Sequence, residues 1–208
     1  MIRLVRRPRA LLRDDRGATI VEFAVVAPVL GLLLLGAFDI AHTLYMRAAL
    51  QGVVQKAARD LTLETGLNAT TQSALDSKVK TQVRALANNG TVTITRQWYR
   101  SYEHAAASKF EPWTDTNNNG TCDPTQGSTP GEPYEDTNGN GRWDGTGGNL
   151  NQGGAKDAVL YTASISYPRF FPIYNLTGGS RTTTVTASTI LRNQPYGDQA
   201  VPTVRNCT

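Results

Sequence analysis

The feature that most constrains this chain is a long apolar run near its N-terminus. From Ile20 to Phe38, 19 residues contain a single charged side chain, Glu22. At about 1.5 Å per residue, a helix of this length crosses a bilayer hydrocarbon core of about 30 Å. The sequence therefore predicts a transmembrane helix.

The charges on the two sides of the run predict its orientation. Asp39 follows the run, and six arginines precede it: Arg3, Arg6, Arg7, Arg9, Arg13 and Arg16. Because basic residues favour the cytoplasmic side, residues from about Ala41 onward are expected outside the cytoplasm. The same cluster accounts for much of the formal net charge of +4, so this charge does not indicate a nucleic-acid-binding face.

Two simpler interpretations of the run explain less of the sequence. A cleaved secretory signal peptide has a shorter apolar core, and no small-x-small cleavage site followed by a polar mature start is present. A plain membrane anchor explains every residue except Glu22. A carboxylate at that depth is costly and usually has a partner or a function.

The residues around Glu22 resemble a processing site. The stretch "RGATIVEF", Arg16 to Phe23, resembles that of type IV pilin precursors, and most closely that of TadE-like pseudopilins, the minor pilins of tight-adherence (Flp) pili. In that family a prepilin peptidase cuts after the glycine, and the fifth mature residue is a glutamate. The resemblance implies cleavage after Gly17, with Ala18 as the first mature residue and Glu22 as the fifth.

The similarity covers both ends of the chain but not its middle. It continues in "LYMRAALQGVVQKAARDL" after the apolar run and in "TVTASTILRNQPYGD" near the C-terminus. Cleavage would leave an ammonium on Ala18, within reach of a carboxylate four residues along the helix, in the same chain or in a neighbouring subunit. Such pairing would keep Glu22 charged during assembly, whereas an unpaired buried carboxylate takes up a proton. The alternative is a solvated carboxylate at the headgroup boundary that has no role.

The sequence after the run predicts an α+β, pilin-like fold. Ala41–Leu63 continues the same helix to a cap near Gly66, and Asn68–Ala87 forms a second helix. The long helix is expected to present a broad apolar stripe made of Leu44, Ala48, Ala49, Val53, Ala57 and Leu61. Alternating polar and apolar residues predict three strands, at Thr91–Arg100, Ala158–Pro168 and Arg181–Leu191. The long transmembrane and stem helix should pack on the small antiparallel sheet that these strands form.

This fold implies a three-part organisation. Residues 1–17 are a basic leader peptide, residues 18–66 are the transmembrane and stem helix, and residues 67–208 are an extracytoplasmic α+β head. The head contains an Asn/Gly-rich insertion at residues 103–157, which is too long for a simple connection between strands.

A duplicated motif lies within this insertion. "EPWTDTNNNGTCD" begins at Glu111 and "EPYEDTNGNGRWD" begins at Glu132, and eight of the thirteen positions are identical. Each copy contains DxNxNGxxD, a calcium-loop pattern in which oxygens at positions 1, 3, 5, 7 and 9 converge on the cation. The candidate ligands are Asp115, Asn117, Asn119, Thr121 and Asp123 in the first copy, and Asp136, Asn138, Asn140, Arg142 and Asp144 in the second. Asparagine at positions 3 and 5 favours weak binding of one or two Ca²⁺ ions at extracellular, millimolar calcium.

Both copies depart from the full calcium loop. Position 12, normally a bidentate glutamate, falls on Gln126 and on Gly147. Glu132 could serve the first loop if the residues before it bulge out, but no comparable glutamate follows the second loop. Flanking helices are also absent from the pattern. The alternative is a metal-free, turn-rich surface loop, and in either case Trp113 and Tyr134 are expected to pack the loops on the sheet.

Cys122 and Cys207 are the two cysteines of the chain. Outside the cytoplasm they could form a disulfide that ties the loop to the C-terminal tail, although two separate thiols are the alternative. The sequence has two histidines and none of the GxSxG, HExxH or phosphate-loop motifs, so an enzyme is not expected.

Two functions remain open from the sequence. The resemblance implies a minor pilin, made as a single-pass inner-membrane precursor with its head in the periplasm, processed by prepilin peptidase and inserted into a surface pilus. Its partners would be that peptidase, the inner-membrane assembly platform and other pilins, both major and minor. The alternative is a permanently anchored periplasmic module whose calcium-dependent loop binds a surface or a partner.

Overall fold

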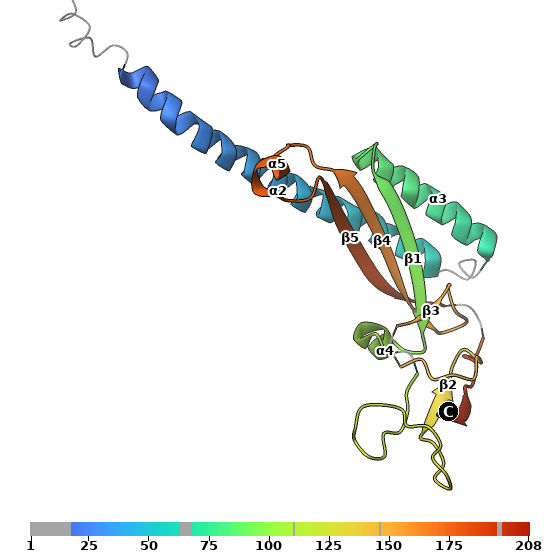
Figure 1. Cartoon of the computed structure of the whole chain (residues 1–208). Coiled ribbons are helices and arrows are strands. Elements are labelled where there is room, and N and C mark those ends of the chain that lie inside the picture. Colours follow the sequence, from blue (N-terminus) through green and yellow to red (C-terminus); the bar gives the residue numbers. More distant parts are fainter. Residues whose placement is uncertain (1–17, 63–67, 110, 146, 195–196) are drawn as a thin grey trace, which may run out of the picture. The chain divides into compact units, whose positions relative to one another are not determined.

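The computed structural model describes residues 18–62, 68–109, 111–145, 147–194 and 197–208. It has an α+β fold, as predicted (Figure 1). The helices are α2 (Ala18–Thr62), α3 (Ala69–Leu86), α4 (Tyr102–Ala107) and α5 (Tyr174–Thr177). The strands are β1 (Thr91–Tyr99), β2 (Pro133–Asp136), β3 (Asn149–Leu150), β4 (Ala158–Pro168), β5 (Thr182–Arg192) and β6 (Thr203–Asn206).

The chain divides into two compact units. One unit comprises Met1–Thr43 with Arg169–Arg181, and the other comprises Leu44–Pro168 with Thr182–Thr208. The helix α2 contributes residues to both units. The proposed leader, including Gly17, and the expected helix end near Gly66 lie outside the described residues.

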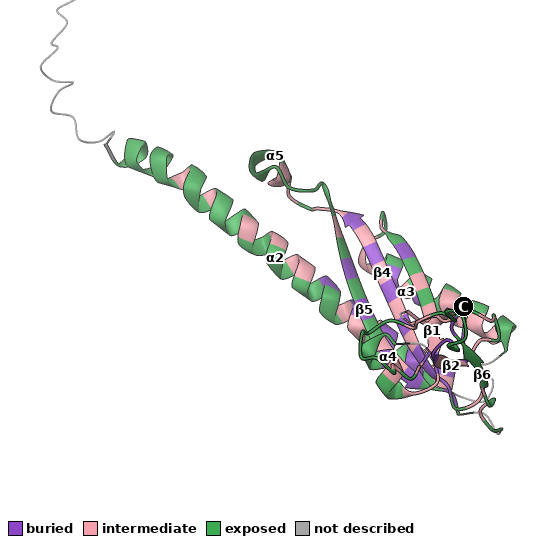
Figure 2. Cartoon of the chain, turned by 60° about the horizontal axis from the view of Figure 1, so that its bottom comes forward, coloured by how far each residue is buried: buried purple, intermediate pink, exposed green. Residues whose placement is uncertain are grey.

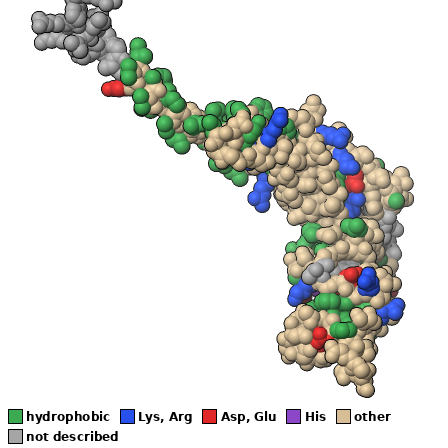
Figure 3. All heavy atoms as spheres, in the orientation of Figure 1, with side chains coloured by type: hydrophobic (Ala, Val, Ile, Leu, Met, Phe, Trp, Pro, Cys, Tyr) green, Lys and Arg blue, Asp and Glu red, His purple; other side chains and the backbone are tan. Residues whose placement is uncertain are grey.

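The N-terminal part of α2 carries the apolar run. Within the described residues, α2 is the one helix long and apolar enough to cross a membrane. This part of the helix is mostly exposed (Figure 2), and apolar side chains cover much of its surface (Figure 3). Ile20, Leu33 and Phe38 are 71%, 67% and 62% exposed. An exposed apolar surface of this size is typical of a segment that contacts a membrane or another protein.

A four-stranded antiparallel sheet forms the centre of the second unit. Its strand order is β3-β1-β4-β5, and β4 pairs with β5 along its whole length and with β1 from Ala158 to Ser166. The three predicted strands are confirmed, with bounds that agree to within one residue. Buried and partly exposed side chains alternate along β4, because successive residues of a strand point to opposite faces.

The core lies between one face of this sheet and two helical segments. The described core includes side chains from α2, α3 and the sheet, among them Leu50, Val83 and Tyr161. The predicted packing of the stem helix on the sheet is therefore confirmed. The side chains that α2 buries are Met46, Leu50, Val54, Ala57, Ala58 and Leu61.

The stripe predicted for α2 was partly wrong. Ala57 and Leu61 are buried as expected, but Leu44 is 60% exposed and Ala48 is also exposed. The helix is rotated so that Met46 and the residues one and two turns after it face the core. Apolar residues on several sides of α2 satisfy helical spacing equally well, so periodicity alone does not fix this rotation.

A polar cluster attaches α3 to the sheet. Asp76 of α3 forms an ion pair with Arg96 of β1 and accepts a hydrogen bond from the Tyr161 hydroxyl at 3.3 Å. The Arg96 guanidinium lies over the Tyr161 ring, 5.3 Å from its centroid. Tyr161 is fully buried, so its hydroxyl needs such a partner. At the start of α3, the Asn68 side chain accepts a hydrogen bond from the Thr70 N–H and caps the helix.

Candidate functional site

The two DxNxNG loops turn in the same way around their first aspartates. Asp115 accepts hydrogen bonds from the N–H groups of Asn119 at 3.2 Å and Gly120 at 2.8 Å. In the second loop, Asp136 accepts from Asn140 at 3.1 Å and from Gly141 at 3.0 Å. The glycines have φ of 79° and 74°, a left-handed conformation that other residues adopt with strain. The duplicated sequence thus folds into duplicated turns.

The last aspartate of each loop closes the turn from the other side. The Asp123 carboxylate accepts hydrogen bonds from the side-chain amides of Asn117 at 2.5 Å and Asn119 at 2.8 Å. In the second loop, Asp144 accepts from Asn138 at 2.9 Å and from Asn140 at 2.8 Å. The predicted ligand side chains at positions 3, 5 and 9 therefore lie together in both loops.

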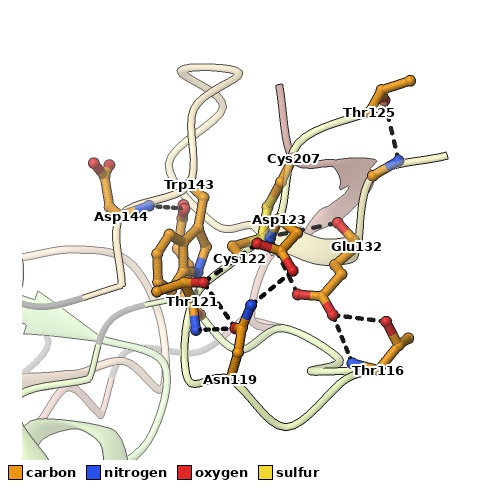
Figure 4. Close-up of a disulfide and its surroundings, with 12 residues drawn as sticks. Thr116, Asn119, Thr121, Cys122, Asp123, Thr125, Glu132, Trp143, Asp144 and Cys207 are labelled. Carbon is orange, nitrogen blue, oxygen red and sulfur yellow. Dashed lines mark hydrogen bonds between the residues drawn. A yellow bond between two sulfur atoms is a disulfide. The ribbon is translucent and has the colours of Figure 1, made fainter. Parts of the chain in front are cut away.

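Glu132 belongs to the first loop. Its carboxylate accepts hydrogen bonds from the Thr116 N–H at 2.6 Å, the Thr116 hydroxyl at 2.7 Å and the Asp123 N–H at 3.2 Å (Figure 4). The Thr116 hydroxyl bond, with help from the backbone bonds, holds the pKa of Glu132 below its usual value. The residues between Asp123 and Glu132 form a bulge closed by reciprocal backbone bonds between Gln126 and Thr129.

Glu111 takes the equivalent place in the second loop, and the sequence analysis missed it. Its carboxylate accepts hydrogen bonds from the Thr137 N–H at 2.9 Å and the Asp144 N–H at 2.8 Å. The residue is 1% exposed, and this burial raises its pKa although the two N–H groups oppose the shift. The signal was present in the sequence, because Glu111 and Glu132 are the same position of the two copies. The usual calcium-loop pattern has its glutamate after the loop, whereas Glu111 precedes both loops in the sequence.

Each copy therefore closes the loop of the other. The glutamate of the first copy binds the second loop, and the glutamate of the second copy binds the first. Between them, Trp113 and Tyr134 form an antiparallel β-bridge, flanked by bonds from the Thr114 N–H to the Pro133 carbonyl and from the Glu135 N–H to the Pro112 carbonyl. Trp113 and Tyr134, which were expected to pack the loops on the sheet, are paired with each other in the structure.

The C-terminal tail holds this arrangement together. A disulfide joins Cys122 to Cys207, whose Cα atoms are 5.9 Å apart (Figure 4). The Cys207 N–H also donates to the Glu132 carbonyl at 2.9 Å, and β6 pairs with β2 along all four residues. The tail thus contacts both copies, since Cys122 lies in the first and β2 lies in the second.

The donor set limits how either loop could hold a metal ion. Within the described part of the chain, no three Asp, Glu, His or Cys side chains form a group that could hold one. A cation would therefore depend on asparagine oxygens and on the backbone carbonyl at position 7. In the structure the amide nitrogens of Asn117 and Asn119 face Asp123, so these amides would have to turn to present oxygen.

The two loops differ in their fit to a cation. Asp136, at position 1 of the second loop, accepts a hydrogen bond from Arg205 Nε at 2.6 Å, and its side chain is fully buried. Position 7 of that loop is also an arginine, Arg142. No described ion pair involves Asp115, and position 7 of the first loop is Thr121. The first loop is therefore the better match for a divalent cation.

The candidate processing and assembly residues lie at the start of α2. Ala18 is the first described residue of the helix, Glu22 lies exposed within its first turns, and Gly17 lies outside the described residues. The exposure of Glu22 in a single chain leaves its carboxylate accessible to a partner.

Comparisons with known proteins identify this N-terminal segment. Residues 17–59 match the family model described as TadE-like protein. No curated protein and no solved structure matches the chain. The match begins at Gly17, contains Glu22 and ends three residues before the end of α2. The resemblance found in the sequence is confirmed over these residues, which are similar to TadE-like proteins.

Proposed function

We propose that the chain is the precursor of a minor pilin of a tight-adherence pilus. Prepilin peptidase would cut it after Gly17, and the mature chain would act in pilus assembly, priming or tip structure. Its partners would be other pilins and the inner-membrane assembly platform. Assembly would move the head from the periplasm to the cell surface.

One observation carries this proposal. The TadE-like match coincides with the exposed apolar part of α2 and continues into its buried stem. The family pattern thus covers both the segment that a pilin uses in the membrane and the segment that joins it to the head. A basic leader before Gly17 and a glutamate at the fifth mature position add sequence support.

The mass of the mature protein tests the processing step. We expect intact-mass and N-terminal peptide analysis of the protein extracted from its native host to show a chain that begins at Ala18. A Gly17→Val variant, which places a branched side chain at the scissile position, should remain at Met1 and serves as the uncut control. An intact Met1 in the natural protein, or a cut beyond Phe38, would contradict the proposal.

The second candidate function is a permanently anchored periplasmic binding module. The disulfide-tied pair of loops favours it, because such a closed insertion is not needed for a helix to assemble into a filament. Shearing pili from cells separates the two functions. A minor pilin should be recovered with the sheared filaments, whereas an anchored module should stay with the membrane fraction.

We further propose that Ca²⁺ binds the head, with the first loop as the principal site. The DxNxNGxxD spacing, the convergence of Asn117, Asn119 and Asp123, and the turn around Asp115 support this assignment. The cation would replace amide–carboxylate hydrogen bonds by oxygen ligands and stiffen the insertion. Its affinity should be weak, because two of the four side-chain ligands are neutral.

Thermal unfolding of the full chain in detergent tests calcium binding. At a calcium concentration about tenfold above Kd, we expect the melting temperature to rise by about 3–6 °C relative to chelator. Asp115→Ala should remove most of this calcium-dependent rise, and the matched Asp136→Ala should remove less. The same concentration of Mg²⁺ should have little effect, since it requires a stricter octahedral geometry. The assignment fails if calcium has no effect, or if Asp115→Ala retains the full rise.

A further inference from the structure

The connection between β4 and β5 is longer than the strands require. The two strands stay paired up to Pro168 and Thr182, so a turn of two to about five residues would join them. The chain instead inserts Arg169–Arg181, with the sequence RFFPIYNLTGGSR. This segment, here called the aromatic loop, contains two arginines, no acidic residue and five large apolar or aromatic side chains.

The aromatic loop exposes apolar side chains from a defined conformation. The Arg169 N–H donates to the Arg181 carbonyl at 2.9 Å, and Arg169 Nε donates to the Ser180 carbonyl at 3.2 Å, so its two ends are tied together. Within it α5 makes one turn, which ends at Gly178 in a left-handed conformation with φ of 69°. Phe170 is nevertheless 74% exposed and Leu176 is 72% exposed. Exposed large apolar side chains held in place in this way indicate a contact surface.

The aromatic loop is attached to α2 at the end of its apolar run. Arg169 forms an ion pair with Asp39, whose side chain is 15% exposed. The centroids of the Phe170 and His42 rings are 5.5 Å apart. Both contacts lie within one compact unit, made of the N-terminal part of α2 and this loop. Asp39 is the first charged residue after the run, so it marks where the helix leaves the hydrocarbon core.

We propose that the aromatic loop is an interfacial membrane anchor, which inserts Phe170 and Leu176 at the boundary between lipid headgroups and acyl chains. This inference rests on the proposed membrane span of α2. Aromatic side chains are enriched at this depth, and arginines there extend their charged groups toward the headgroups. The ion pair with Arg169 neutralises Asp39 where a carboxylate alone would resist insertion. The absence of acidic residues from the loop suits a bilayer that contains anionic phospholipid.

Spin labels at three matched leucines test the anchor in the full chain. Leu33→Cys, Leu150→Cys and Leu176→Cys replace side chains that are 67%, 68% and 72% exposed. They report on the membrane helix, on the head and on the aromatic loop. The labelled proteins are reconstituted at low density in vesicles of phosphatidylethanolamine and phosphatidylglycerol. For each spin label, the rate of collision with oxygen, which partitions into lipid, is compared with the rate of collision with a water-soluble nickel chelate.

We expect the accessibility of the Leu176 label to the nickel chelate to lie between those of the Leu33 and Leu150 labels. The Leu33 label should collide mainly with oxygen and the Leu150 label mainly with nickel. The Leu176 label should be protected from nickel at least several-fold relative to Leu150. Two outcomes overturn the anchor while the span stands: a Leu176 label as accessible to nickel as Leu150, or spin–spin broadening at Leu176 that shows a second copy against it. A Leu33 label accessible to nickel overturns the proposed span, and the anchor with it.

Discussion

At the scale of single residues, Glu111 and Glu132 show how a duplicated sequence produces a reciprocal structure. They occupy one position of the repeat, and each accepts hydrogen bonds from the loop of the opposite copy. Their surroundings differ, because burial raises the pKa of Glu111 whereas the Thr116 hydroxyl lowers that of Glu132. At neutral pH Glu132 therefore stabilises its loop as a carboxylate, a contribution that is lost as the pH falls through its lowered pKa.

The crossed arrangement predicts crossed effects of mutation. In chelator, Glu132→Gln should raise amide hydrogen exchange at Thr116 and Asp123 on the order of tenfold, while exchange in the second loop stays the same. Glu111→Gln should do the reverse, at Thr137 and Asp144. The reason is that a glutamine side chain has one acceptor oxygen where the glutamate has two, so the loop of the opposite copy loses one hydrogen-bond acceptor. Each variant is the control for the other, and exchange that rises in the variant's own copy would refute the arrangement.

The paired loops also show what the sequence could not supply at this scale. The ligand spacing and the role of Glu132 in the first loop could be proposed from the order of residues alone. For Glu111 the repeat gave only its equivalence to Glu132, because its contact with the second loop depends on a pairing of the two copies through Trp113 and Tyr134 that local spacing does not contain. The ion pair between Arg205 and Asp136 depends likewise on the return of the C-terminal tail.

At the scale of elements, the strands were predictable and the rotation of the long helix was not. Alternation along Ala158–Pro168 has period two, so one face of β4 is fixed once one buried residue is known. In α2, apolar residues occur on several sides, and the buried face is selected by the sheet and by α3. Leu44 and Leu50 lie six residues apart, yet one is 60% exposed and the other is fully buried.

These two leucines provide a matched pair of substitutions. Leu50→Ala should lower the free energy of unfolding of the head by about 2–5 kcal/mol, because it leaves a cavity between α2 and the sheet. Leu44→Ala should change it by less than about 0.5 kcal/mol. Urea unfolding in detergent, followed by the fluorescence of Trp98 beside the core, measures both. A larger loss for Leu44→Ala than for Leu50→Ala would mean that the helix presents the face expected from the sequence to the core.

At the scale of the whole molecule, the N-terminal helix matches a known family, whereas the insertion in the head lies outside that match. The N-terminal helix carries the TadE-like pattern over residues 17–59. The insertion that holds the loops lies outside this match and is organised by its own repeat, its disulfide and the C-terminal strand. A family pattern could predict the N-terminal helix, while the head's insertion had to be derived from the chemistry of its residues.

In the proposed function, Glu22 would connect the processing of the chain to its assembly, and this role gives the last prediction. A carboxylate among apolar residues is stable as a charge only with a cationic partner, and the Ala18 ammonium would exist only after cleavage at Gly17. Glu22→Ala should therefore be cut as the natural chain is. It should be depleted at least about tenfold from sheared pili, because it loses one charge pair that is shielded from water.

Intact mass measures cleavage, and quantitative mass spectrometry of filaments measures incorporation. Glu22→Asp, which keeps the charge on a shorter side chain, should restore part of the incorporation. Natural levels of Glu22→Ala in filaments would show that the carboxylate has no part in docking, whereas an uncut Glu22→Ala chain would place its role in peptidase recognition.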